Sequence, residues 1–174
     1  MMKKLSMSAF CVFLPIMLLI YGIFFKKYDI ILNSLYTIMW LAVFMIFHKK
    51  TNFLTTKTYY CILVFILLSV FAGKSLGFYK LIPKWDKMLH FISGFIIVAS
   101  GKQLYKKLEG NEKNKKLMNV FSLSVAFSMA CLWEITEFFS DKLFGTVAQN
   151  NSLNDTMWDM IAGTSSALIA LLFL

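Results

Sequence analysis

The chain has 174 residues, of which 59% are hydrophobic, 17% aromatic and only 16% charged. Soluble domains have roughly 45–50% apolar residues, so this composition excludes an ordinary soluble protein and is typical of a helical membrane protein. The net charge of +9 comes from 18 lysines against nine acids. Because the lysines lie in short segments beside apolar runs, they favour membrane orientation and contact with anionic lipid headgroups, and nucleic-acid binding is not expected.

Six apolar segments follow one another along the chain, each near the ~20 residues that a helix needs to cross a bilayer. The first follows MMKK. It is longer than the ~7–15 apolar residues of a signal peptide and no small-residue cleavage site follows it, so we expect a retained helix that can bend at Pro15. We predict an all-α transmembrane bundle, one membrane domain over residues 1–174, with six spans at residues 5–25, 30–47, 59–78, 86–104, 117–139 and 157–174.

Turn and packing signals mark the later part of the chain. Pro83 ends any helix after the third span, and Trp85 suits the membrane interface. Small residues in the fourth and sixth spans predict closely packed helices: Ser93, Gly94, Ser100, Gly101, Gly163, Ser166, Ala167 and Ala170. The cysteines lie in apolar segments without C-x-x-C spacing and are expected to be buried apolar residues, not disulfides or metal ligands: Cys11, Cys61 and Cys131.

The distribution of lysines predicts the orientation in the membrane. Alternate loops place eleven on the side of the N-terminus: Lys3, Lys4, Lys49, Lys50, Lys57, Lys102, Lys106, Lys107, Lys113, Lys115 and Lys116. Six lie on the other side: Lys26, Lys27, Lys80, Lys84, Lys87 and Lys142. Since the lysine-rich side of a bacterial membrane protein faces the cytoplasm, we expect both termini inside and a location in the plasma (inner) membrane.

Polar residues gather near the extracytoplasmic ends of four predicted spans. A charged side chain deep in a bilayer costs ~2.5–3.5 kcal/mol on insertion scales, so such a cluster indicates a functional site. Alternating topology brings the ends of these spans to one depth, whichever helices touch. The residues are Lys74 in the third span, Asp86 and His90 in the fourth, Glu134 and Glu137 in the fifth, and Asp155 and Asp159 at the start of the sixth.

Some of these residues have simpler explanations. Asp86 and Asp155, like Asp141, can cap a helix N-terminus or lie at the interface. His90 can be a core histidine bonded to a carbonyl, and Lys74 can extend to the interface or neutralise a carboxylate.

Glu134, Glu137 and Asp159 are harder to explain as structural residues. The two glutamates are three residues apart on an apolar helix and face nearly the same way. Two like charges so placed need a counter-charge, a metal or a shared proton. Asp159 follows Trp158 and precedes an apolar run.

We therefore predict that His90, Glu134, Glu137 and Asp159 are the catalytic residues and the ligands of a divalent metal ion, supported by Asp86, Asp155 and Lys74. One imidazole with several carboxylates suits Zn²⁺, Mn²⁺ or Mg²⁺, whose bound water would be the nucleophile. The spacing differs from the H-E-x-x-H zinc motif, and no serine or cysteine nucleophile pattern is present.

Several of these residues lie in motifs that resemble a known family. The order DKMLHF, WEITEF, a G-x-x-x-Q loop at residues 145–149 and DTMWDMIAG is similar to that of the YjdF-like bacterial inner-membrane proteins, a family without an assigned function. The matching positions lie within residues 80–174: Asp86, His90, Trp133, Glu134, Glu137, Asp155, Thr156, Trp158, Asp159 and Met160. A looser similarity to VanZ-like cell-envelope proteins rests on D-K-x-x-H-F and a late acidic motif, but Glu137 and Gly163 depart from that pattern.

Three functions fit this pattern of residues. The first is an outward-facing enzyme or binding site for an amphipathic cell-envelope or lipid-like substrate. The second is a small ion- or proton-coupled transporter, in which the acids and His90 relay protons or bind a cation; the acids, however, lie near one surface and no inverted repeat is evident. The third is a non-catalytic protein whose polar cluster fixes helix packing or binds a partner.

Overall fold

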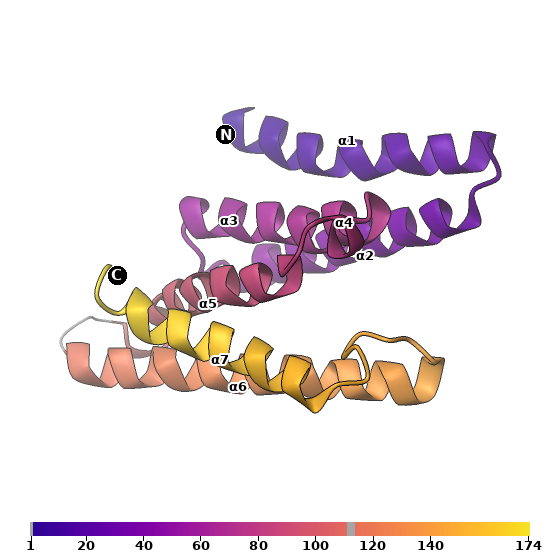
Figure 1. The fold of residues 1–174 in the computed structure, drawn as a ribbon. Coiled ribbons are helices and arrows are strands. Elements are labelled where there is room, and N and C mark those ends of the chain that lie inside the picture. Colours follow the sequence, from indigo (N-terminus) through magenta and orange to yellow (C-terminus); the bar gives the residue numbers. More distant parts are fainter. Residues whose placement is uncertain (1, 111–113) are drawn as a thin grey trace. The chain divides into compact units, whose positions relative to one another are not determined.

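The fold is known from a computed structural model, which describes residues 2–110 and 114–174 and the side chains of all of these except residues 2–6. The lysines predicted to orient the chain at positions 3, 4 and 113 lie outside the described side chains. Every regular element in the described part is a helix, so the all-α prediction is confirmed for those residues (Figure 1). The chain forms two compact units that meet in sequence between Trp85 and Asp86.

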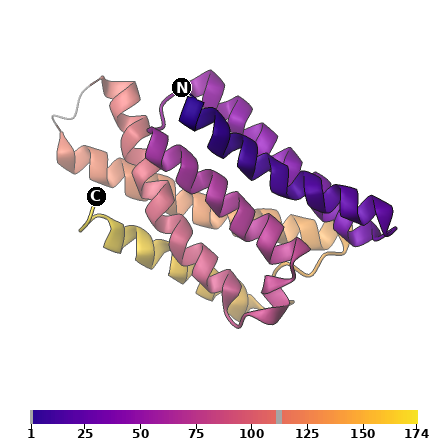
Figure 2. The same ribbon diagram turned by 90° about the horizontal axis from the view of Figure 1, so that it is seen from above.

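The first unit begins with a helical hairpin. Helices α1 (Met2–Phe24) and α2 (Tyr28–Thr51) pack side by side along their length, as Figure 2 shows. α1 ends in a tight turn in which Lys26 has a φ of 53° and the Lys27 N–H donates to the Gly22 carbonyl at 2.8 Å. This is a Schellman-type helix end. α1 continues through Pro15, where the sequence allowed a bend.

The third predicted span changes from α-helix to π-helix along its length. Helix α3 (Thr56–Ile66) passes directly into a π-helical segment, η1 (Leu67–Ser75), which ends three residues before the predicted boundary. A short helix, α4 (Phe78–Leu81), follows. Gly73 in η1 packs so closely on the Tyr79 ring that an added Cβ would lie 2.3 Å from it. π-helical turns are rare and costly, and apolar periodicity does not separate them from α-helix, so the sequence did not predict this one.

The first unit has an aromatic and aliphatic core. Its buried residues are Cys11, Leu41, Tyr59, Leu63, Ile66 and Val70. The prediction that all three cysteines are buried is wrong for two of them, because Cys61 and Cys131 are exposed on the helix surfaces. All three are free thiols, in agreement with the expected absence of disulfides.

The second unit contains three helices joined by short loops. They are α5 (Trp85–Glu109), α6 (Lys115–Phe144) and α7 (Leu153–Ala170). The Asn114 side chain caps α6 by accepting from the Leu117 N–H at 3.0 Å. α6 runs on to Gly145, whose φ of 66° ends it, so the predicted polar loop from residue 140 starts later than expected.

Small residues let α5 approach both of its neighbours in this unit. A Cβ at Gly94 would lie 1.9 Å from the Ser166 Oγ of α7, and a Cβ at Gly101 would lie 2.9 Å from the Ser122 Cα of α6. Val98, Ala126 and Ala167 form the core between these contacts. The small-residue spacing in the predicted fourth and sixth spans thus marks helix packing.

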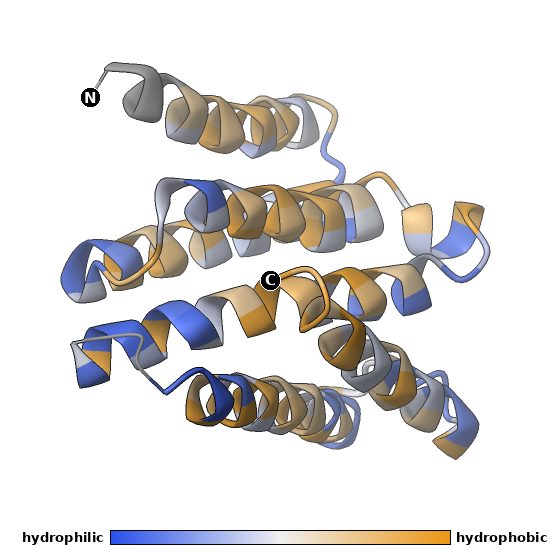
Figure 3. Ribbon diagram, turned by 90° about the vertical axis from the view of Figure 1, so that its left-hand side faces the viewer, coloured by the Kyte–Doolittle hydropathy of each residue, from blue (hydrophilic) through white to orange (hydrophobic). Residues whose placement is uncertain are grey.

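Four helical stretches are long and apolar enough to cross a membrane: Met7–Phe24, Tyr28–Thr51, Thr56–Ser75 and Lys115–Phe144. α5 and α7, which carry the predicted fourth and sixth spans, are not among them. Figure 3 shows more hydrophilic residues along the second unit, near the end of α5 above all. Six spans, and the orientation that follows from them, therefore stay predictions.

Candidate functional site

The first turns of α5 present three polar side chains. Asp86 and Lys87 lie in the first turn of α5, and His90 lies in the second. Asp86 and His90 are four residues apart and so lie on one face of the helix. His90 is buried, with 8% of its surface exposed. Burial fixes its ring against the two other helices of the unit.

On α6, the two glutamates have different surroundings. Glu134 is buried, with 4% of its surface exposed. Glu137, nearly one turn later, is half-buried, and its Oε1 accepts from the Trp133 indole N–H at 2.8 Å. Although the spacing places both on one side of the helix, only Glu134 lies against α5 in the described contacts.

On α7, a capped N-terminus positions the two aspartates. The Ser152 side chain accepts from the Asp155 N–H at 3.4 Å and so begins the helix. Asp155 lies in the first turn, and Asp159 follows one turn later with 1% of its surface exposed. The Thr156 hydroxyl accepts from the Gln149 side-chain amide at 3.0 Å.

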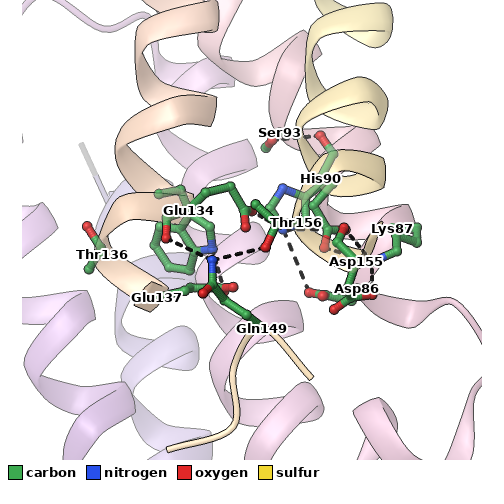
Figure 4. A network of polar contacts seen from close by, with 12 residues as sticks. Asp86, Lys87, His90, Ser93, Glu134, Thr136, Glu137, Gln149, Asp155 and Thr156 are labelled. Carbon is green, nitrogen blue, oxygen red and sulfur yellow. Dashed lines mark hydrogen bonds and ion pairs between the residues drawn. The ribbon is translucent and has the colours of Figure 1, made fainter. Parts of the chain in front are cut away.

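Four of these side chains converge within the second unit, and we call Asp86, His90, Glu134 and Asp159 the acidic–histidine cluster. The His90 Nε2 lies 3.7 Å from Glu134 Oε1, 3.8 Å from Asp86 Oδ1 and 3.8 Å from Asp159 Oδ1. Figure 4 shows His90 between Glu134 on one side and Asp86 on the other. One imidazole nitrogen is thus almost equally distant from three carboxylates that come from three helices.

The innermost carboxylates lack hydrogen bonds. Within the described residues, neither Oε1 nor Oε2 of Glu134 has a hydrogen-bond partner, and the same holds for Asp159 Oδ1. A buried polar atom without a partner costs about 1–3 kcal/mol, and more when it carries charge. These oxygens therefore have a strong requirement for a proton or a cation.

Lys87 partly satisfies the outer side of the cluster. Its ammonium bonds Asp159 Oδ2 at 2.7 Å and also forms an ion pair with Asp155 Oδ1. The carbonyl of Asp155 accepts from the same ammonium at 3.3 Å. Lys87 thus joins α5 to α7 and leaves Asp159 Oδ1 facing His90.

The loop between α6 and α7 is held against the site by side-chain hydrogen bonds. Asp141 accepts from the Thr146 hydroxyl at 2.5 Å, from the Ala148 N–H at 2.7 Å and from the Gln149 N–H at 3.0 Å. The Gln149 amide then donates to the Glu134 carbonyl at 3.3 Å and to Thr156. Asp141 lies near the C-terminal end of α6 and orders the loop that follows, so it is not an N-terminal cap. Its expected place at the membrane interface stays a prediction.

The structure separates the predicted site residues into four groups. Glu137, a predicted ligand, forms one by itself: it is half-buried, bonded to Trp133 and outside the cluster. Asp86, placed by the sequence in a supporting role, lies in the cluster itself with the predicted ligands His90, Glu134 and Asp159. Asp155 is tied to Lys87 and to the Asn150 amide, which donates to its Oδ2 at 2.6 Å. Lys74 lies in the first unit, with its ammonium 4.8 Å from the centre of the Tyr36 ring. The roles of all these residues stay predictions.

Sequence reasoning missed two residues that bond the site. Lys87 was counted only as a loop charge, although it lies inside the DKMLHF motif and three residues before His90. Gln149 appeared only as the end of a G-x-x-x-Q loop. In both cases position inside a motif was the available signal, and charge counting or loop composition concealed it.

A metal ion would find a compact donor set here. One atom each from Asp86, His90 and Asp159 lies within 4.8 Å of the others. Glu134 Oε1 lies beside His90 Nε2 at 3.7 Å, outside this set of three atoms. Three carboxylates and an imidazole are ligands that Zn²⁺ and Mn²⁺ accept.

The long apolar helices and the buried ionisable cluster define a helical membrane protein with a polar interior site. The chain belongs to the family described as "Predicted membrane protein (DUF2238)", whose model matches residues 6–174. An "Uncharacterized protein" of Thermotoga maritima is 34% identical over 131 residues, which cover 72% of this chain and 67% of that protein. No solved structure matches the chain.

Proposed function

We propose that the acidic–histidine cluster binds one divalent metal ion, and that this ion serves an activity at the extracytoplasmic side of the bacterial plasma membrane. The observation that carries the proposal is the set of buried carboxylate oxygens on Glu134 and Asp159 that have no hydrogen bond among the described residues. The family match is in keeping with the YjdF-like resemblance, while the similarity to VanZ-like proteins stays a prediction.

The distances around His90 support a metal more than a hydrogen bond. Separations of 3.7–3.8 Å from His90 Nε2 to the carboxylate oxygens are too long for hydrogen bonds. Two ligands that each lie ~2.1 Å from a tetrahedral metal are roughly 3.4 Å apart. Small side-chain movements would therefore bring these donors into one coordination sphere.

Charge also supports a cation. Lys87 is the one lysine that forms a described ion pair with the acids of the site, and its partners are Asp155 and the outer oxygen of Asp159. Glu134, Asp86 and Asp159 Oδ1 face His90 without a lysine. A divalent ion supplies the missing positive charge at a depth where water is scarce.

The chemistry of the donor set limits the identity of the ion and its use. An imidazole with carboxylates fits Zn²⁺ or Mn²⁺ well, while Mg²⁺ usually keeps several waters. A Zn²⁺ ion held by Asp86, His90, Glu134 and Asp159 would supply a water activated for nucleophilic attack. We therefore place a hydrolytic or binding activity toward an amphipathic, cell-envelope or lipid-like molecule first; the transporter alternative has no observation in its favour beyond the buried acids.

A structural role is the second candidate. The Lys87 ion pairs to Asp155 and Asp159 connect α5 with α7, and protonated Glu134 could remain buried without a metal. This candidate predicts that variants in the cluster change stability alone.

Elemental analysis of the detergent-purified protein distinguishes these candidates. We expect about one Zn²⁺ or Mn²⁺ per chain in the wild type, and loss of that ion in Glu134→Gln and Asp159→Asn. Glu137→Gln is the matched control, because it removes the same charge from the same helix outside the cluster and should keep the ion. A folded wild-type protein that holds no ion after Mn²⁺ or Zn²⁺ is added would overturn the metal proposal in favour of the structural one.

A further inference from the structure

The Lys87 ammonium sits in a shell of oxygens like those that surround a metal ion. Its neighbours are Asp159 Oδ2 at 2.7 Å, the Asp155 carbonyl at 3.3 Å and the ion-paired Asp155 Oδ1. Carboxylate and carbonyl oxygens are the ligands that hard divalent cations prefer. The side chain of Lys87 is 25% exposed, so this shell has access to the surroundings.

Asp159 connects this shell to the acidic–histidine cluster. Its Oδ2 bonds Lys87, while its Oδ1 faces His90 at 3.8 Å. A carboxylate that offers one oxygen to each of two cations is the usual bridge in two-metal sites. Here one of the two cation positions is filled by an amine of the chain itself.

We propose that Lys87 is a specificity-determining residue that occupies a second cation position and so limits the site to one divalent ion. The inference rests on the proposed metal site. The second position consists of Asp155 Oδ1, the Asp155 carbonyl and Asp159 Oδ2. The Asn150 amide donates to Asp155 Oδ2 at 2.6 Å and so holds the Asp155 carboxylate of this position in place.

The physical reason is electrostatic. A lysine ammonium is a compact point charge with three donors, and it replaces a cation without adding a second divalent charge. A second divalent ion next to the first would repel it unless further anions were supplied. With Lys87 present, Asp155 Oδ1 and Asp159 Oδ2 already have a positive charge beside them.

The test is metal stoichiometry in Lys87→Met, which removes the ammonium group and keeps an unbranched side chain one atom shorter. After saturation with Mn²⁺ and gel filtration, we expect the content to rise from one ion per chain in the wild type to two. Lys142→Met is the matched control, because Lys142 is an exposed lysine of the same unit whose described neighbour is the Phe138 ring; it should keep one ion. The double variant Lys87→Met, Asp155→Asn should also return to one.

Failure of this inference is distinct from failure of the metal site itself. One ion, or none, in folded Lys87→Met beside one in the wild type would overturn the role of Lys87 and leave the proposed site standing. No ion in the wild type would overturn both. If too little Lys87→Met is obtained for metal analysis, its melting temperature with and without Mn²⁺ is a second measurement. Mn²⁺ should raise that temperature more than it does in the wild type, and an equal or smaller rise would overturn the proposal.

Discussion

Gly94 is the residue at which α5 comes closest to α7. An added Cβ would lie 1.9 Å from the Ser166 Oγ and 2.4 Å from the Gly163 carbonyl oxygen, far inside van der Waals contact. His90 lies one turn before Gly94 and Asp159 one turn before Gly163. The spacing between the two helices at this glycine thus sets the spacing across the cluster.

We predict that Gly94→Ala separates α5 from α7 and weakens metal binding. Overpacking of this kind costs about 1–3 kcal/mol, and it should lower both the melting temperature in detergent and the affinity for Mn²⁺. Gly163→Ala is the control, because its nearest neighbour is the His90 carbonyl oxygen at 3.5 Å, an ordinary contact. Equal stability of the two variants would contradict the close approach at Gly94.

At this scale the sequence identified the types of residue in the site better than their partners. The acids and His90 were found because charge in an apolar helix is costly. Spacing alone treated Glu134 and Glu137 as equivalent, since residues three apart share a helix face. Their difference arises from which side of α6 faces His90 on α5, which a single sequence does not specify.

Among the elements, the loop of residues 145–152 depends on one side chain of the preceding helix. Asp141 accepts three hydrogen bonds from this loop, two of them from backbone N–H groups. Gln149 is thereby held where its amide reaches Glu134 and Thr156. The loop is therefore part of the support of the site.

We predict that Asp141→Ala releases the loop and leaves the helices intact. Because the backbone N–H groups of the loop lose their acceptor, amide hydrogen exchange at residues 146–149 should become faster while that of α7 stays slow. Asp29→Ala provides a control, since Asp29 lies in the first turn of α2 in the other unit. Unchanged exchange at Ala148 and Gln149 would show that the loop is ordered by other contacts.

Hydropathy predicted where helices occur and, less well, their ends and their kind. Each of the six predicted spans overlaps a helix, because length and apolar composition suffice for that inference. The π-helical segment η1 and the short α4 were missed, since the packing of Tyr79 on Gly73 involves residues outside the apolar run. α5 and α7 are less apolar because they carry the site and the small residues of its packing.

For the whole molecule, the positions of Lys107 and Val147 distinguish six membrane spans from four. If six helices cross the membrane with the N-terminus inside, Lys107 faces the cytoplasm and Val147 faces outward. If only the four most apolar stretches cross, the two positions exchange sides. Both residues are exposed, so a label can reach either one.

We predict the six-span arrangement. In a background without Cys11, Cys61 and Cys131, Val147→Cys should react with a membrane-impermeant maleimide in intact cells, and Lys107→Cys only after permeabilisation. We expect this result because the lysine-rich side of the chain should face the cytoplasm. The loop that contains Val147 lies on the opposite side of the six-span arrangement. The reverse labelling pattern would overturn this arrangement and place the loop after α6 on the cytoplasmic side, as four spans or an inverted bundle would.

The helix starts at the site divide its acids into two classes. α5 and α7 both begin here, and the amide dipoles of a helix give its N-terminus about half a positive charge, an effect that fades within the first turn. Asp86 and Asp155 lie in those first turns and are therefore partly neutralised by the backbone. Glu134 lies deep within α6 and Asp159 a turn further along α7, beyond that reach. The backbone thus supplies permanent compensation to the rim, whereas Glu134 and Asp159 Oδ1 require a proton or the proposed ion.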